Sequence, residues 1–485
     1  MAIALAIVCL GVAPPTPDIA LPPLTAKQIA SIDGFLKLEM ARTHVPGAAV
    51  GIYSRGTILL AKGYGLANVE LDVPVKPQTI FQSGSVGKQF VSAAIMMLVQ
   101  KGQISLDDSI TKYFPNAPAS WNPIEIKNLL SHTSGLAEYV SPDRTGPEGP
   151  FYLRLDFTEN QLLTKIEALP VENAPGVKWD YRNTNYVLLG MLIHRVTGMF
   201  YADYLTKYIF APLGMTTTRL ISEQAIILNR AAGYQWENGK LENQDWVSPS
   251  FNSTADGALY FTVLDLAKWD AALYGTRLLD QSSLDRIWTV YPLNDGKPNP
   301  GDYGFGWAIG KQNGHRLIEH GGAWQGFTCQ ISRYADDSLT VVVLTNLDAD
   351  HARADYAAHV IAGLVLPALL PPRLVPIADA QPQIASSLRS ILDAAEANRP
   401  IASYVSADFA KYVPNADALL RRDLAGLWPG TLVLVDREPS PDDPTLTISE
   451  FRLSSGSKSV LVLFGLNAKG RVDALEFEPN EEYKA

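Results

Sequence analysis

The fold of this chain is decided by FQSGSVGKQF (residues 81–90), which runs directly into VSAAIMMLVQ (residues 91–100). The second stretch is apolar and rich in helix formers, and a glycine ends it, so we predict a buried helix over residues 85–101. Residues three apart lie on the same face of a helix. Ser85 and Lys88 are therefore expected to point the same way from the first turn of a helix that the core surrounds.

Ser85 and Lys88 have the chemistry of a nucleophile and its base. A neutral serine hydroxyl is a poor nucleophile, but a neighbouring lysine amine accepts its proton when burial or nearby cations lower the lysine pKa. Backbone N–H groups at a helix N-terminus also favour a developing oxyanion. The alternative is a chance match, because many helices contain Ser-x-x-Lys. Against it, Lys88 is the only charged residue between Lys76 and Lys101 and lies among apolar side chains, unlike a solvated lysine.

The composition indicates a large globular protein. A chain of 485 residues predicts two or three domains, and 47% hydrophobic with 19% charged residues is ordinary for a protein with a core. The formal net charge of −10 argues against nucleic acid or an anionic membrane as the main partner. Cys9 and Cys329 make neither a disulfide framework nor a zinc site, and the 7 histidines show no metal-ligand spacing. We therefore expect no metal and no cofactor.

Residues 1–22 have features of an export signal. Residues 1–13 are an apolar run that is too short to span a bilayer, and prolines follow it. Such a run resembles the apolar core and small-residue end of a secretory signal, although no basic segment precedes it. We expect a periplasmic or secreted protein without stable membrane insertion; the alternative is a buried or disordered tail on a cytoplasmic protein. A lipid anchor at Cys9 is disfavoured by Val8, where a small residue is expected.

The segments over residues 23–368 predict one α+β domain. A β-hairpin is expected over residues 47–64, and a continuous apolar run over residues 338–345 is typical of a central strand. The other expected elements are helices over 25–41, 126–135, 186–198, 199–214, 264–274 and 349–366, strands over 303–309 and 326–334, and a long surface excursion over 141–180. Helices inserted between the strands of one antiparallel sheet give an α+β plan.

A second, smaller domain is expected after a linker. Residues 369–383 are rich in proline, which is typical of a linker. Beyond them, over residues 384–485, helices near 384–397 and 415–426 precede strands over 431–435, 445–452, 458–464 and 471–477. This order predicts a separate C-terminal α+β domain of common size.

Two further stretches carry candidate site residues. In WDYRNTNY (residues 179–186), Tyr181 and Asn183 are two apart in a loop and can face one cleft; the alternative is an ordinary aromatic on its rim. In IEHGGAWQGF (residues 318–327), which we expect to precede a strand, a histidine offers a charge-tunable donor. The alternative for that histidine is a structural, hydrogen-bonded role. The two glycines after it would let a substrate run close to the backbone.

In this order, Ser-Val-Gly-Lys (85–88), Tyr-Arg-Asn (181–183) and His-Gly-Gly (320–322) resemble the serine β-lactamase and penicillin-binding-protein superfamily. The resemblance is strongest to its branch of class C β-lactamases, D-aminopeptidases and family VIII esterases. It spans about residues 25–365, with supporting stretches at 129–136, 183–190, 255–260, 265–269 and 303–307. It implies a β-lactamase/transpeptidase-like fold, in which helices flank an antiparallel sheet and an all-helical subdomain is added.

The resemblance also implies a mechanism. Ser85 would attack a carbonyl carbon and form an acyl-enzyme, and Lys88 would accept its proton. Tyr181 would relay a proton to the leaving group or activate water. The backbone N–H groups of Ser85 and Ala323 would form the oxyanion hole. Asn183 would contact the amide or ester side of the substrate.

The third motif departs from that of true β-lactamases, which have Lys-Thr-Gly where this chain has His320, Gly321 and Gly322. The change removes a fixed positive charge and a hydroxyl that hold the β-lactam carboxylate. His320 would instead orient Tyr181 or bind a substrate carboxylate. The resemblance thus implies a serine hydrolase for small carboxylic esters or D-amino-acid-containing peptides and amides. The alternatives are a weak β-lactamase or D,D-carboxypeptidase, a penicillin-binding sensor with little turnover, and a structural protein with a decayed site. A homo-oligomer is compatible with the sequence.

Overall fold

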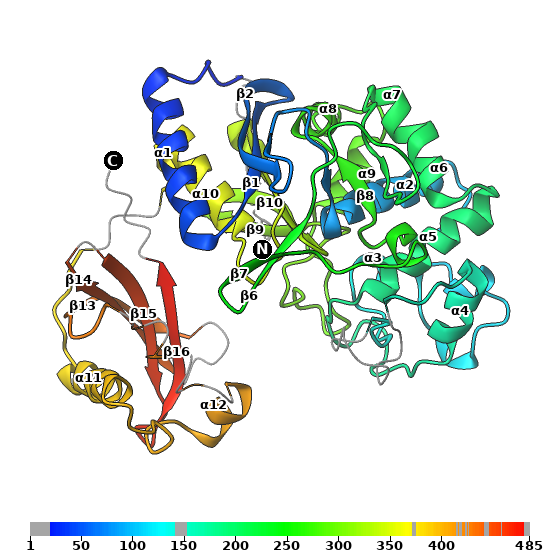
Figure 1. Ribbon diagram of the computed structural model, residues 1–485. Coiled ribbons are helices and arrows are strands. Elements are labelled where there is room, and N and C mark those ends of the chain that lie inside the picture. Colours follow the sequence, from blue (N-terminus) through cyan, green and yellow to red (C-terminus); the bar gives the residue numbers. More distant parts are fainter. Residues whose placement is uncertain are drawn as a thin grey trace, which may run out of the picture. The chain divides into compact units, whose positions relative to one another are not determined.

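An antiparallel sheet of seven strands forms the centre of the first of two units, Met1–Leu370 and Pro371–Ala485, in this computed structural model (Figure 1). The structure describes residues 20–140, 153–370, 375–413, 416, 420, 421, 424, 426–440, 446–456 and 458–479. The strands are β1 (Gly47–Ser54), β2 (Thr57–Asn68), β3 (Val73–Pro74), β9 (Ala308–Gln312), β10 (His315–Trp324), β11 (Phe327–Tyr334) and β12 (Leu339–Thr345). Their order in the sheet is β3-β2-β1-β12-β11-β10-β9. The predicted hairpin and the central position of β12 are confirmed, since β12 lies fourth and all its residues are buried.

One strand prediction is wrong in its bounds, and one strand was not predicted. The strand expected over residues 303–309 begins only at Ala308. Residues 318–327 precede β11 as predicted, but His320, Gly321 and Gly322 themselves lie inside another strand, β10, which we did not predict. Glycine is depleted in strands, so two adjacent glycines weaken the strand signal in the sequence. The neighbouring strands nevertheless form the hydrogen-bond ladder with β10.

Helices cover both faces of the sheet, which explains why β1 is buried along its whole length. On one face lie α1 (Ala26–Thr43) and α10 (Ala354–Val365), and on the other lies α8 (Val263–Ala272) (Figure 1). The helical part of the unit contains α2 (Lys88–Gln100), α3 (Ile126–Leu130), α4 (Glu159–Glu167), α5 (Asn183–Thr197), α6 (Tyr201–Leu205), a π-helical turn (Thr206–Phe210), α7 (Ala211–Leu213) and α9 (Gln281–Ile287). The predicted α+β plan is confirmed.

The excursion expected over residues 141–180 contains a helix that we did not predict. Residues 141–152 lie outside the described residues, but Glu159–Glu167 form α4. The signal for this helix was present in the sequence. Thr158 and Gln161 form a capping box, in which each side chain accepts a hydrogen bond from the other's backbone N–H.

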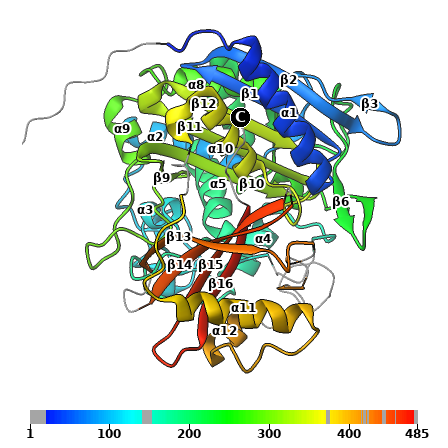
Figure 2. The same cartoon turned by 90° about the vertical axis from the view of Figure 1, so that its left-hand side faces the viewer.

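The second unit has its own core. Its strands β13 (Thr431–Pro439), β14 (Thr447–Ser455), β15 (Lys458–Leu466) and β16 (Val472–Pro479) lie side by side in that order (Figure 2). Helix α11 (Pro382–Glu396) contributes Leu388 and Leu392 to an apolar cluster with Phe451 and Phe464 of the sheet. The four strands and the first helix agree with prediction, whereas α12 (Ala407–Tyr412) was not predicted. The helix expected over 415–426 falls largely outside the described residues.

Within the part of the chain that the structure describes, no helix combines the length and the apolar character that crossing a membrane requires. The expected leader over residues 1–22 lies almost wholly outside that part. The expected domain and linker bounds stay predictions.

Candidate active site

Ser85 stands in a 3₁₀ turn (Gly84–Gly87) that leads directly into α2. The helix predicted over residues 85–101 is thus present, but its first turn is wound more tightly and α-helical bonding begins at Lys88. Of the 13 residues of α2, 11 are buried. Burying a large apolar side chain stabilises a fold by about 1.5–3 kcal/mol, so this helix is a firm support for the turn that carries Ser85.

The amine of Lys88 is the centre of the site. Its Nζ lies 2.8 Å from Ser85 Oγ and 2.8 Å from Asn183 Oδ1, and it donates to the backbone carbonyl of Asp256 at 2.7 Å. The side chain is fully buried. Burial lowers the pKa of Lys88 to about 8, although the carboxylates of Asp256 and Glu138 oppose this shift. An amine with such a pKa can accept the Ser85 proton near neutral pH.

Tyr181 lies against this pair. Lys88 Nζ stands 4.9 Å from the centre of the Tyr181 ring, and the ring packs on His132 with 4.2 Å between centroids. Burial raises the pKa of Tyr181, and the nearby Ser85 hydroxyl partly offsets the rise, so Tyr181 stays a phenol at neutral pH. The buried Tyr181 hydroxyl has no hydrogen-bond partner among the described residues. Tyr181 is not in the lining of the cavity beside Ser85, so its part in proton transfer stays a prediction.

Strand β10 passes directly beside the turn that carries the nucleophile. A Cβ on Gly322 would lie 2.2 Å from the carbonyl oxygen of Ser83 and 2.9 Å from Val86 N. Real Cβ atoms do not approach so closely, so this glycine is required for the strand to contact the turn. The predicted reason, the approach of a substrate to the backbone, is not the constraint that the structure shows at this position.

The turn itself needs a glycine for the same contact. Gly84 has a φ of +46°, and a Cβ there would lie 2.4 Å from Ala323 N. The backbone of Ala323 is thereby held against the residue that precedes Ser85. The assignment of the Ser85 and Ala323 N–H groups as an oxyanion hole stays a prediction, which this proximity favours.

His320 is buried and is not among the residues that line the cavity beside Ser85. Its Nε2 lies 2.8 Å from the hydroxyl of Tyr303, and its Nδ1 donates to the carbonyl of Gly321 at 2.5 Å. Burial, together with the Lys88 cation, lowers the pKa of His320 to about 3. The ring centroid lies 6.2 Å from that of Tyr181. A neutral, buried imidazole offers no charge to a carboxylate, so the geometry favours the predicted orienting role over the carboxylate-binding one.

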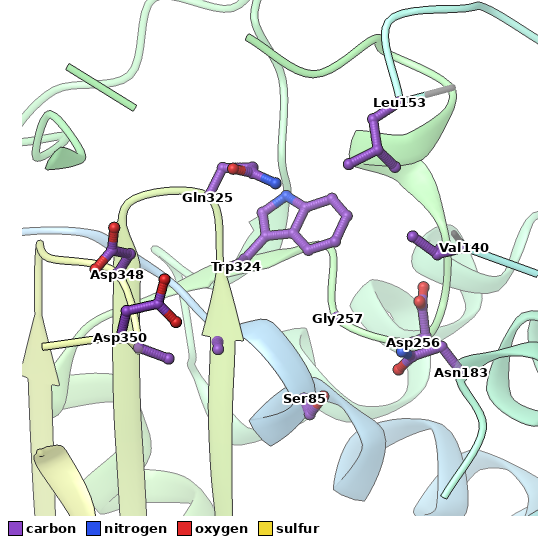
Figure 3. A pocket seen from close by; sticks show the side chains of 12 residues that line it. Ser85, Val140, Leu153, Asn183, Asp256, Gly257, Trp324, Gln325, Asp348 and Asp350 are labelled. Atoms are coloured by element: carbon purple, nitrogen blue, oxygen red, sulfur yellow. The ribbon is translucent and has the colours of Figure 1, made fainter. Parts of the chain in front are cut away.

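The cavity beside Ser85 is lined by residues that lie far apart in the sequence of the first unit (Figure 3). Its volume, about 740 Å³ including the open mouth, is in the range of small-molecule sites. The lining consists of Ser85, Val140, Leu153, Asn183, Asp256, Gly257, Ala323, Trp324, Gln325, Asp348, Ala349 and Asp350. Of the predicted site residues, Ser85, Asn183 and Ala323 line the cavity. Lys88, Tyr181, His320, Gly321 and Gly322 are not among its lining residues.

Sequence reasoning missed two acidic residues of the site. The carboxylate of Glu138 accepts hydrogen bonds from the N–H groups of Asn183 (2.7 Å), Tyr139 (2.8 Å) and Val140 (3.2 Å), and burial raises its pKa. It therefore anchors the start of α5, and no motif in the sequence marks it. Asp256 holds Lys88 through its carbonyl and lies in the supporting stretch 255–260, which was a signal for it.

Fold and site together define a serine hydrolase of the β-lactamase and penicillin-binding-protein type. An antiparallel sheet with helices on both faces is combined with a Ser-x-x-Lys pair, whose lysine is buried, at the start of a core helix. The family model described as Beta-lactamase matches residues 32–366, and the chain belongs to this family. The predicted superfamily is thus confirmed.

Several known proteins are similar to this chain. Penicillin-binding protein 4* of Bacillus subtilis (strain 168) is 30% identical over 340 residues, which cover 64% of this chain and 72% of that protein. Protein flp of Staphylococcus aureus (strain COL) is 29% identical over 343 residues, which cover 68% of this chain and 65% of flp. The chain thus spans slightly less than two thirds of flp.

Two solved structures extend the comparison. The octameric penicillin-binding protein homologue from Pyrococcus abyssi has a TM-score of 0.62 at 24% identity, covering 93% of this chain and 98% of that one, and it bears on the fold alone. The D-amino acid amidase from Ochrobactrum anthropi SV3, in complex with L-phenylalanine amide, has a TM-score of 0.60 at 26% identity and covers 71% of this chain and 98% of that one.

Proposed function

We propose that this protein hydrolyses D-amino-acid amides and peptides, or carboxylic esters, through an acyl-enzyme on Ser85. The observation that carries the proposal is the buried Lys88 amine, 2.8 Å from Ser85 Oγ and with a pKa of about 8. Such an amine is a general base for the serine hydroxyl. A solvated lysine would remain protonated and would not take this role.

The proposed reaction has two halves. Lys88 takes the proton of Ser85, and the Ser85 oxygen attacks the substrate carbonyl carbon while the N–H groups of Ser85 and Ala323 stabilise the oxyanion. The bond to the leaving group breaks as the group receives a proton through Lys88 or Tyr181. Water then attacks the acyl-enzyme, loses a proton to the same groups, and releases the acid and free Ser85.

The substrate class rests on two supports. His320 is neutral and buried where β-lactamases place a lysine, so the site lacks a fixed charge for the β-lactam carboxylate. In addition, the D-amino acid amidase of Ochrobactrum anthropi shares this fold. Both favour D-amino-acid amides and esters over efficient β-lactamase activity.

The test is hydrolysis of p-nitrophenyl butyrate, D-alanyl p-nitroanilide and nitrocefin by the wild type and by Ser85→Ala. We expect turnover of the first or second substrate, little of nitrocefin, and a loss of at least about 10³-fold in Ser85→Ala with an unchanged melting temperature. Turnover that survives Ser85→Ala would overturn the proposal. Labelling of Ser85 by a fluorescent penicillin without turnover of any substrate would replace it with the sensor function.

A further inference from the structure

The cavity beside Ser85 is strongly acidic. Three of its lining residues are Asp256, Asp348 and Asp350, and none of its lining residues is a lysine, arginine or histidine. We propose that the site takes acyl donors that carry a positively charged amine, and that these carboxylates hold the ammonium group. The inference rests on the proposed function, because it names the substrate class that the same acyl-enzyme would accept.

Asp256 supplies the strongest evidence. Its side chain is only 5% exposed, and one carboxylate oxygen accepts a hydrogen bond from the Tyr139 hydroxyl at 3.0 Å. The other oxygen, Oδ1, has no hydrogen-bond partner among the described residues. A buried carboxylate oxygen without a donor is unfavourable, so such groups are normally completed by a partner. An ammonium group in the cavity would supply that partner, on the same residue whose carbonyl holds Lys88.

Asp348 and Asp350 line the cavity from the loop that follows β12 (Figure 3). The backbone N–H of Asp348 donates to the carbonyl of Tyr234 at 3.1 Å, which fixes the start of this loop. Asp348 Oδ1 lies 3.9 Å from His351 Nδ1, beyond hydrogen-bond distance, and has no such partner among the described residues. A second buried carboxylate oxygen, on a residue that lines the cavity, therefore lacks a hydrogen-bond donor.

Trp324 joins the acidic residues in the lining, and Figure 3 shows its indole extending from the end of β10. Its Nε1–H donates to Asn252 Oδ1 at 2.8 Å, which fixes the plane of the ring. The face of an indole attracts cations through its quadrupole. An aromatic face among carboxylates is a combination that binds an ammonium group and repels a carboxylate.

Three basic side chains lie near this charge, and none of them is in the lining. They are Lys88, which the Asp256 carboxylate attracts, His320, and His351, whose Nδ1 lies 3.9 Å from Asp348 Oδ1. The amine of Lys88 is fully buried and is occupied by Ser85, Asn183 and Asp256. His320 is held by Tyr303 and Gly321. An anionic acyl donor would meet three carboxylates without a compensating cation in the lining, whereas a cationic donor would meet three partners.

The test compares kcat/KM for D-alanyl p-nitroanilide with that for its N-acetyl and N-succinyl derivatives, in which the amine is neutral or replaced by an anion. We expect the wild type to prefer the free amine by at least about tenfold over the N-acetyl form, and to act least on the N-succinyl form. In Asp348→Asn, Asp350→Asn and Asp256→Asn we expect this ratio to fall toward one. The ratio is internally normalised, so it is informative even where Asp256→Asn lowers the overall rate through Lys88.

Asp336→Asn is the matched control, because it removes the same charge from the turn before β12, at the other end of that strand. We expect it to keep the wild-type ratio. A wild-type enzyme that turns over all three substrates alike, or prefers the N-succinyl form, in a Ser85-dependent manner would overturn the inference and leave the proposed function intact. Turnover that survives Ser85→Ala would instead remove the proposed function.

Discussion

The Ser85 side of the cavity and the Asp348 side differ in how firmly the chain fixes them. Ser85 stands on a turn that a buried helix and strand β10 hold from two directions, and its partner Lys88 makes three short polar contacts. Asp348 and Asp350 stand on a loop after β12, where Asp350 is exposed. Packed elements thus hold Ser85 and Lys88, whereas two of the three carboxylates in the cavity lining lie on a loop.

Substituting Lys88, on the firmly held Ser85 side of the cavity, should have the largest effect on activity. We expect Lys88→Met, which keeps the length of the side chain but removes the amine, to lower kcat for p-nitrophenyl butyrate by about 10²- to 10⁴-fold. Lys101→Met, the same change at the exposed C-terminal end of α2, is the control and should leave kcat near its wild-type value. Stopped-flow and steady-state assays of the folded variants measure this. A Lys88→Met enzyme with more than a tenth of the wild-type kcat would show that another group is the base.

The close contact of β10 with the nucleophile turn gives the next effect. A methyl group at Gly322 would overlap the Ser83 carbonyl, so we expect Gly322→Ala to lower the free energy of unfolding by about 1–3 kcal/mol. The displaced turn should also lower kcat by about 10²-fold.

The control for this contact is Gly310→Ala in β9, where no atom lies within 4 Å of the added Cβ. It should change both quantities little. Chemical denaturation and the ester assay measure the two effects. Equal behaviour of Gly322→Ala and Gly310→Ala would contradict the proposed contact between the strand and the turn.

The pH dependence should show a smaller effect. Lys88 must be neutral to accept a proton, and its pKa is lowered to about 8, so the active fraction grows with rising pH. We expect kcat/KM for the uncharged p-nitrophenyl butyrate, corrected for spontaneous hydrolysis, to rise about tenfold between about pH 7 and about pH 9. His320, with its pKa near 3, and Tyr181, with its raised pKa, add no inflection in this range. A rate that is flat or falls across the range would contradict the role of Lys88.

The Ser85 side of the cavity was well predicted, because short sequence patterns specify its helix, its Ser-x-x-Lys pair and its central strand. The apolar helix, its Ser-x-x-Lys pair and the apolar run of β12 all appear where expected. The contribution of β10 was concealed because its two glycines weaken the strand signal, and only the packing against Ser83 and Val86 explains them.

The Asp348 side of the cavity was not predictable in the same way. Asp348 and Asp350 lie more than 250 positions from Ser85 in the chain and belong to no motif, so only the folded sheet brings them to one cavity. Glu138 was missed for a related reason. Its carboxylate accepts hydrogen bonds from backbone N–H groups, and such contacts leave no motif in the sequence.

Whether Ser85 is the nucleophile can be measured by mass spectrometry of the protein quenched in acid during turnover of p-nitrophenyl butyrate. We expect a butyryl adduct on the peptide that contains Ser85, and none on Ser85→Ala treated in the same way. An adduct on a different residue, or an equal adduct on Ser85→Ala, would contradict the assignment of Ser85 as the nucleophile.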